Sequence, residues 1–210
     1  MPTYCVTPFT HTRFFLHTLL YAGVEAVMLD NEHGVIPPAE LKAALAVLAG
    51  KARAIVRPEV TSVEAVERYW DLGARCFLLP KVEDLETLAA VAARVGELAG
   101  GELDRLSVIP LIESQAALDR IEQIAAIPQV GTLELGPFDL ARDLGVADFR
   151  TSPAFVDLME TQVRRIAATG KGAGLYMLPD WAERLRDAPL ELISLGVYEI
   201  VGDYLKRLPR

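Results

Sequence analysis

The sequence predicts an α/β protein that folds as a single compact (β/α)8 barrel, a TIM barrel, over residues 1–210. Three observations support this prediction. Short apolar runs alternate with amphipathic segments along the whole chain. The apolar runs are almost continuous, as is typical of parallel strands that are buried on both faces. Eight such runs occur within 210 residues, which matches the strand number of this barrel at the short end of its size range.

The apolar runs are predicted to be strands. They lie at Tyr4–Pro8, Ala26–Asp30, Arg53–Arg57, Cys76–Pro80, Ser107–Ile112, Thr132–Gly136, Gly172–Met177 and Leu192–Ile200. Each strand is expected to be followed by a helix that covers the outside of the barrel. A doubly wound parallel sheet shows the same alternation, usually with fewer strands, and is the alternative architecture.

The segments between the strands have the apolar spacing of helices. In Ala39–Leu48, Asp84–Leu98 and Ala154–Ala168, apolar residues recur every three or four positions, which places them on one helix face. No linker, composition change or low-complexity tract divides the sequence, so a single domain is expected.

The composition excludes several classes of function. The chain has 21 Lys and Arg residues against 29 Asp and Glu residues, a formal net charge of −8. Such an acidic surface repels phosphate backbones and anionic lipids, so neither nucleic acid nor a membrane is an expected partner. Cys5 and Cys76 lie singly inside apolar runs and are predicted to be reduced core thiols. With no recognisable signal peptide, this predicts a cytoplasmic protein.

Ionisable residues follow five consecutive predicted strands. In a (β/α)8 barrel, the carboxyl ends of the strands meet at the rim that carries the active site. The residues in these positions are Asp30, Asn31, Glu32 and His33 after the second strand, Arg57 after the third, Lys81 after the fourth, Glu113 after the fifth and Asp139 after the sixth. We therefore expect their side chains to converge on one site.

Each of these residues also has a structural interpretation. Glu113 follows a run that buries it, and a buried carboxylate needs a cation or hydrogen-bond partners, so either an arginine or a metal ion fits. Asp139 fits the N-cap of a helix that begins at Leu140 as well as it fits a metal site. Arg57 fits a structural ion pair, and His33 fits an ordinary loop position.

Considered together, the residues favour a catalytic site. Glu113 and Asp139 end adjacent strands, roughly 5 Å apart, and two carboxylates at that separation can share one Mg²⁺ or Mn²⁺ ion. Arg57 would lie opposite the cation, where its guanidinium can bind a substrate carboxylate. Histidine is the side chain best suited to moving a proton near neutral pH, which gives His33 an acid–base role.

Two neighbouring features complete the predicted site. Asp30 is placed to orient His33 or Arg57, and we count it with them among the catalytic residues. The Gly136-Pro137 turn is expected to expose backbone N–H groups just before the next helix, where they can contact a substrate anion.

Five segments of the chain resemble motifs of one family. They are 26–34 (AVMLDNEHG), 56–58 (VRP), 71–80 (DLGARCFLLP), 109–114 (IPLIES) and 135–145 (LGPFDLARDLG). In this order and spacing they resemble the HpcH/HpaI aldolase family, which also contains the citrate-lyase β-subunit-like proteins. Leu111 is a departure, because aldolases of this family often carry a polar residue there.

The resemblance implies a divalent-metal-dependent carbon–carbon lyase that acts on a pyruvate-like 2-oxo acid. It places the metal ligands at Glu113 and Asp139, the carboxylate-binding arginine at Arg57 and the acid–base histidine at His33. Reversible cleavage would proceed through a pyruvate-type enolate, and a homo-oligomer is expected. The alternatives are a citrate-lyase-like enzyme that cleaves a CoA thioester and a barrel that binds a metabolite without turnover.

Overall fold

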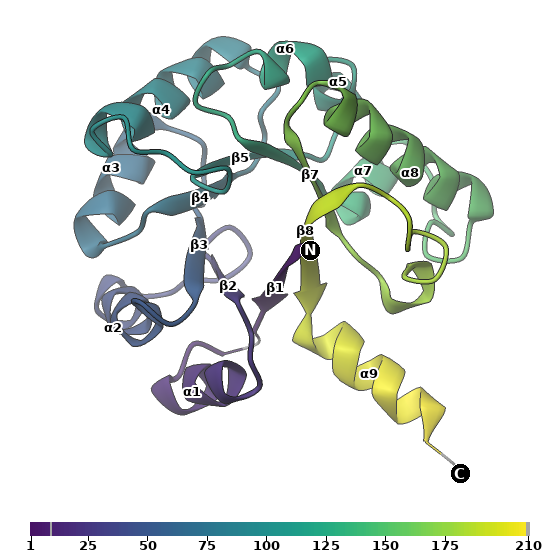
Figure 1. Ribbon diagram of the computed structural model, residues 1–210, viewed down its shortest axis with the longest axis horizontal. Helices are drawn as coiled ribbons and strands as arrows, with labels where there is room; N and C mark the ends of the chain where they lie inside the picture. Colours follow the sequence, from purple (N-terminus) through teal and green to yellow (C-terminus); the bar gives the residue numbers. More distant parts are fainter. Residues whose placement is uncertain (9, 209–210) are drawn as a thin grey trace.

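The protein forms a closed barrel of eight parallel strands, so the predicted (β/α)8 fold is confirmed (Figure 1). The computed structural model describes residues 1–8 and 10–208. The strands are β1 (Thr3–Thr7), β2 (Ala26–Asp30), β3 (Arg53–Arg57), β4 (Cys76–Leu79), β5 (Val108–Ile112), β6 (Thr132–Leu135), β7 (Gly172–Tyr176) and β8 (Leu190–Gly196). Each strand pairs with the next in sequence order, and β8 closes the barrel against β1.

Helices surround the strands on the outside of the barrel (Figure 1). They are α1 (Arg13–Tyr21), α2 (Pro38–Leu48), α3 (Val63–Leu72), α4 (Leu85–Leu98), α5 (Gln115–Leu118), α6 (Ile121–Ala125), α7 (Pro137–Asp143), α8 (Pro153–Ala168) and α9 (Val197–Arg207). One expectation is wrong, because β7 is followed only by the short 3-10 turn η1 (Pro179–Trp181) and not by a helix. Within residues 1–8 and 10–208, no helix has both the length and the apolar character needed to cross a bilayer.

The two faces of the strands contribute to two apolar cores. The larger core lies between the strands and the helices and includes Leu29, Val56 and Leu135. The smaller core fills the barrel and includes Met28 and Leu78. Burial on both faces explains why the strand sequences are continuously apolar. The two cysteines lie in the inner core as unpaired thiols, as predicted.

The end of the barrel differs from the sequence-based prediction. The eighth strand was expected at Leu192–Ile200, but β8 ends at Gly196 and α9 begins at Val197. The apolar run continues across this boundary, so hydrophobicity alone does not mark where the strand stops. In Figure 1, α9 extends away from the ring of helices, and apolar side chains including Val201, Tyr204 and Leu205 are exposed on it.

Candidate active site

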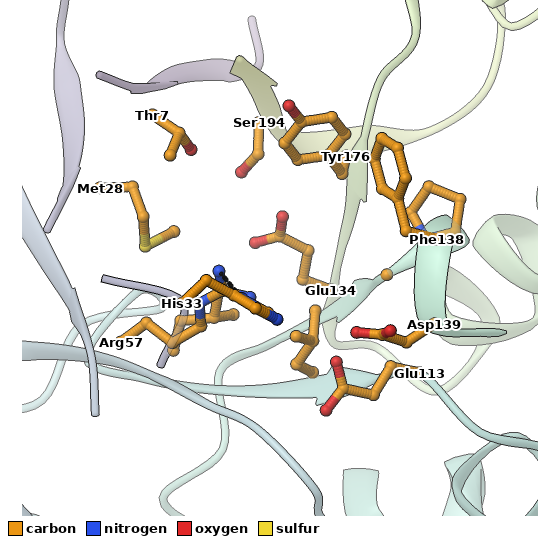
Figure 2. A pocket seen from close by; sticks show the side chains of 14 residues that line it. Thr7, Met28, His33, Arg57, Glu113, Glu134, Phe138, Asp139, Tyr176 and Ser194 are labelled. Carbon is orange, nitrogen blue, oxygen red and sulfur yellow. Dashed lines mark hydrogen bonds between the residues drawn. The ribbon is translucent and has the colours of Figure 1, made fainter. Parts of the chain in front are cut away.

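A cavity of about 340 Å³ opens at the carboxyl ends of the strands, the rim where the site was expected. Figure 2 shows the side chains that surround it. Of the predicted site residues, those that line the cavity are His33, Arg57, Glu113, Gly136, Pro137 and Asp139. Asp30 does not line the cavity but accepts a hydrogen bond from Arg57. The structure thus brings together groups from four segments that are distant in sequence.

Arg57 is held at the end of β3 by the acids that follow β2. It lies beside Asp30 in the sheet register, and its Nε and Nη2 atoms donate to the two carboxylate oxygens of Asp30 at 2.8 and 2.5 Å. Its Nη1 atom lies 3.2 Å from Oε2 of Glu32. Burial disfavours the ionised form of Asp30, but the hydrogen bonds and charge of Arg57 outweigh it and lower the pKa of Asp30. Both groups are therefore charged and fixed in position.

His33 lies at the mouth of the cavity with 60% of its side chain exposed. Its Nδ1 atom is 2.8 Å from Nη2 of Arg57. A guanidinium can only donate, so Nδ1 accepts this hydrogen bond and the neutral ring carries its hydrogen on Nε2. Asp30 shapes the same loop, because its Oδ1 atom accepts the backbone N–H of Glu32 at 3.0 Å.

Glu113 directly follows β5 and is only 6% exposed. Its Oε1 atom accepts the backbone N–H of Lys81 at 2.9 Å, and among the described residues Glu113 forms no ion pair. Burial raises the pKa of Glu113 to about 7; the Lys81 N–H and the charge of Arg57 act to lower it, and the nearby carboxylates of Glu32 and Asp139 act to raise it. The positive charge near Glu113 is thus too small to stabilise its ionised form.

Asp139 lies in the first turn of α7, next to Glu113 at the cavity wall (Figure 2). The N-cap of α7 is Gly136, so the capping role considered for Asp139 is not the one that it has. Its Oδ1 atom lies 2.7 Å from Nη2 of Arg142, which is largely exposed. A Cβ atom at Gly136 would approach the Cβ atom of Glu113 and the Cδ1 atom of Leu111 to 3.2 Å, so glycine leaves room for these two side chains.

The Gly136-Pro137 turn does not present the N–H groups that were expected of it. The N–H of Gly136 donates to the carbonyl oxygen of Ile112 at 2.9 Å, and proline has no N–H. The one backbone donor of the Gly136-Pro137 turn is therefore used in the hydrogen bond to Ile112. Both residues line the cavity through their backbone and ring atoms instead.

Glu32, which the sequence placed at this rim, is not among the residues that line the cavity, whereas Thr7, Glu134, Tyr176 and Ser194 line it and were not predicted as site residues. Glu32 connects Arg57 to Lys81, whose Nζ atom lies 3.2 Å from its Oε1 atom. Glu134, on β6, and Ser194, on β8, line the cavity from inside the barrel. The signal for Glu134 is a single charged residue in the middle of an apolar strand, which is costly unless it has a function.

The carboxylates do not form a larger chelating cluster. In the part of the chain that the structure describes, no group of three or more His, Cys, Asp or Glu side chains is arranged to hold a metal ion. Glu113 and Asp139 form a pair, which leaves the remaining positions around any shared cation open to substrate and water.

Comparison with known proteins shows the family of the chain. Residues 11–197 match the family model described as HpcH/HpaI aldolase/citrate lyase. The chain belongs to this family. The expectation of a carbon–carbon lyase is thereby confirmed. A related sequence is the 2-keto-3-deoxy-L-rhamnonate aldolase of Escherichia coli K12, which is 26% identical over 211 residues that cover 89% of this chain and 79% of the relative.

Solved structures of HpcH/HpaI proteins have the same barrel. The HpcH/HpaI aldolase from Desulfitobacterium hafniense aligns with a TM-score of 0.82 at 18% identity and covers 99% of this chain and 94% of that chain. A family member from Burkholderia cenocepacia aligns at 0.78 and 25% identity, with coverages of 98% and 91%. The citrate lyase β subunit of M. tuberculosis, solved with oxaloacetate and magnesium, aligns at 0.64 and 20% identity, with coverages of 99% and 97%.

Proposed function

We propose that this HpcH/HpaI protein is a divalent-metal-dependent aldolase of the class II type, which makes and breaks carbon–carbon bonds to the enolate of a pyruvate-like 2-oxo acid. One observation carries the proposal: Glu113, Asp139, Arg57 and His33 come from different βα units and line one cavity. A carboxylate pair, a guanidinium and an imidazole are the groups that this reaction needs.

The acids fit a divalent cation such as Mg²⁺ or Mn²⁺. Glu113 and Asp139 offer hard oxygen ligands from neighbouring βα units, which suit either ion. The raised pKa of Glu113, caused by burial and by Glu32 and Asp139, supports this assignment, because a cation would relieve the repulsion between these carboxylates. When bound, the cation supplies a Lewis acid that stabilises negative charge on the carbonyl oxygen of the substrate.

Arg57 attracts and orients the substrate carboxylate. Its guanidinium has five N–H donors, of which Asp30 and His33 engage three, and Glu32 lies beside Nη1. The positive charge is therefore fixed at the cavity wall with donor capacity remaining on Nη1. Asp30 acts as a positioning residue, because it holds the guanidinium plane and does not line the cavity itself.

His33 holds and moves a proton at the cavity mouth. Its basic lone pair is on Nδ1, where Asp30 Oδ2 and Glu32 Oε2 lie 3.8 and 3.7 Å away. When Nδ1 takes up a proton, it can no longer accept the hydrogen bond from Arg57. The positively charged ring is then attracted to the carboxylates of Asp30 and Glu32. The Nε2–H group is left to donate a hydrogen bond to a substrate oxygen.

The test is deuterium exchange into the methyl group of pyruvate, followed by NMR, because it needs no knowledge of the aldol acceptor. We expect exchange with Mg²⁺ or Mn²⁺ that disappears with a chelator and in Glu113→Ala. Glu102→Ala, which removes an exposed carboxylate from the loop before β5, is the matched control and should exchange normally. Tight metal binding without exchange would contradict the proposal and would favour CoA-thioester cleavage.

We also propose a homo-oligomer in the cytoplasm. The exposed apolar residues on α9, among them Val201, Tyr204 and Leu205, support an association between copies of the chain. The unpaired thiols of Cys5 and Cys76 are compatible with a reducing compartment.

A further inference from the structure

The inner wall of the active-site cavity carries two buried polar groups that the proposed mechanism does not use. Glu134 on β6 is 2% exposed and Ser194 on β8 is 1% exposed, and both line the cavity. Oε2 of Glu134 and Oγ of Ser194 have no hydrogen-bond partner of suitable geometry among the described residues, although the Ser194 hydroxyl lies close enough to lower the pKa of Glu134. Buried polar groups in folded proteins are almost always paired, so an unpaired pair that faces a cavity indicates a ligand.

The fold makes room for Glu134. Gly174 on β7 pairs with Glu134 in the sheet register, and a Cβ atom there would approach the Cβ atom of Glu134 to 3.1 Å. Any larger residue at position 174 would therefore press against the Cα, Cβ and Cγ atoms of Glu134, which would have to shift. Gly174 on β7 thus has no side chain at the point where it lies beside Glu134. Glycine in a strand often marks such a close approach.

The surroundings of Glu134 are otherwise apolar on the side towards β2, β4 and β5, where Met28, Leu78 and Leu111 line the cavity. Figure 2 shows Glu134 between Ser194 on one side and the Glu113–Asp139 pair on the other. A small molecule held at that pair and at Arg57 thus has Glu134 and Ser194 as its polar neighbours deeper in the barrel.

We propose that Glu134 and Ser194 form a subsite for a hydroxyl group of the substrate, so that the enzyme prefers a hydroxylated substrate to its deoxy analogue. This inference rests on the proposed aldolase function and specifies its substrate class. A hydroxyl group both donates and accepts hydrogen bonds, and a carboxyl and a serine hydroxyl that face the same space can satisfy both. The hydroxyl group belongs either to the 2-oxo acid or to the aldehyde.

The protonation of Glu134 is compatible with this role. Burial raises the pKa of Glu134 to about 7, against the opposing effects of the neighbouring Ser194 hydroxyl and the charge of Arg57. Near neutral pH the carboxyl can therefore bind a hydroxyl group as an acceptor or, when protonated, as a donor.

The first experiment compares the binding of hydroxypyruvate and pyruvate to the Mg²⁺-loaded protein by calorimetry. If the hydroxyl group is on the 2-oxo acid, we expect hydroxypyruvate to bind about tenfold more tightly, the effect of one or two hydrogen bonds. The ratio of the affinities for hydroxypyruvate and pyruvate should fall to about one in Glu134→Leu and in Ser194→Ala. Glu134→Gln, which keeps a donor and an acceptor, should retain most of the preference, and Glu102→Leu is the exposed control.

The second experiment compares glycolaldehyde with acetaldehyde as the acceptor for pyruvate. If the hydroxyl group is on the aldehyde, kcat/KM should be about tenfold higher for glycolaldehyde, with the same loss in Glu134→Leu and Ser194→Ala. No preference for the hydroxylated partner in either pair would overturn the inference, as would a preference that both variants retain. If the wild-type protein exchanges pyruvate protons but shows no preference, only the subsite is wrong; if it shows no exchange, the aldolase proposal itself fails.

Discussion

The backbone N–H of Lys81 donates a hydrogen bond to Oε1 of Glu113 over 2.9 Å, and Lys81 makes this contact with a φ angle of 54°. Among the described residues, it is the one non-glycine residue with positive φ. The left-handed region is unfavourable for a residue with a Cβ atom, and such strain is concentrated at functional sites. The loop after β4 therefore accepts an unfavourable backbone conformation at the position where it contacts the proposed metal ligand.

Replacing Lys81 with glycine should relieve this strain. We expect the free energy of unfolding of Lys81→Gly to exceed that of Lys81→Ala by roughly 0.5–1 kcal/mol, because glycine adopts positive φ without steric cost. Lys81→Ala is the matched control, since both variants lose the ion pair with Glu32. Urea denaturation measures the difference, and equal stability of the two variants would show that the backbone at position 81 is not strained.

Asp30→Asn tests the positioning of Arg57. The variant keeps the shape of the side chain but loses the charge that fixes the guanidinium, so we expect the KM for pyruvate to rise about tenfold, the cost of weakening a charged hydrogen bond. Steady-state kinetics provides the measurement. Asp104→Asn is the control, because Asp104 pairs with Arg53 at the opposite end of β3. A similar effect of both changes would indicate general loss of stability rather than lost orientation.

The sequence predicted the barrel well because the signals for its elements are local. The strands β2 and β3 were placed at their observed bounds, Ala26–Asp30 and Arg53–Arg57, because polar or turn-forming residues bound both apolar runs. The boundary between β8 and α9 was missed because Gly196 is the one turn-forming residue there and apolar residues resume directly after it at Val197 and Tyr198. Where a strand passes directly into an amphipathic helix, composition does not separate the two.

The candidate site was predictable in which residues meet and in the contact of Asp30 with Arg57, but not in the other pairings. Barrel topology places the ends of β2, β3 and β5 at one rim, so Arg57 and Glu113 were expected there. The contacts of Arg57 with Glu32 and His33 depend on side-chain directions that the sequence does not encode locally. The hydrogen bond from the Gly136 N–H to the Ile112 carbonyl likewise depends on how β5 and β6 are aligned.

His33→Gln tests the acid–base role. Glutamine can form hydrogen bonds from the same position but cannot take up a proton, so we expect kcat for aldol cleavage to fall about 10²–10⁴-fold. Calorimetry should find that pyruvate binding changes far less, because Arg57 carries that interaction. His17→Gln, an exposed histidine on α1, is the control. If cleavage continues at the wild-type rate in His33→Gln, another group transfers the proton.

If the exposed apolar residues of α9 join copies of the chain, a charge placed among them should weaken the proposed homo-oligomer. Size-exclusion chromatography with light scattering should find the wild-type chain at a multiple of 23.0 kDa. Leu205→Glu places a charge among the exposed apolar residues of α9 and should shift the protein towards the monomer mass. Lys206→Glu, on the next position of the same helix, should not. A wild-type protein that is already monomeric contradicts the proposed homo-oligomer.

Glu134 predicts a specific pH dependence of stability. Its pKa is about 7 in the folded protein against an ordinary value of 4.5, so the folded state holds this proton more tightly than the unfolded state. Its contribution to stability is therefore fully present below about pH 4.5 and is lost as the pH rises through 7. The loss is on the order of 3 kcal/mol over that interval.

Glu134→Leu removes this titration and isolates its effect. With a chelator present, the melting temperature of the variant should be close to that of the wild type near pH 4.5 and should exceed it increasingly up to about pH 7.5, where the difference levels off. Glu102→Leu is the control, because it makes the same substitution at an exposed carboxylate in the loop before β5, outside the cavity. A constant difference between Glu134→Leu and the wild type across this range would mean that Glu134 titrates alike in the folded and unfolded states, because only a pKa that differs between the two states makes stability depend on pH.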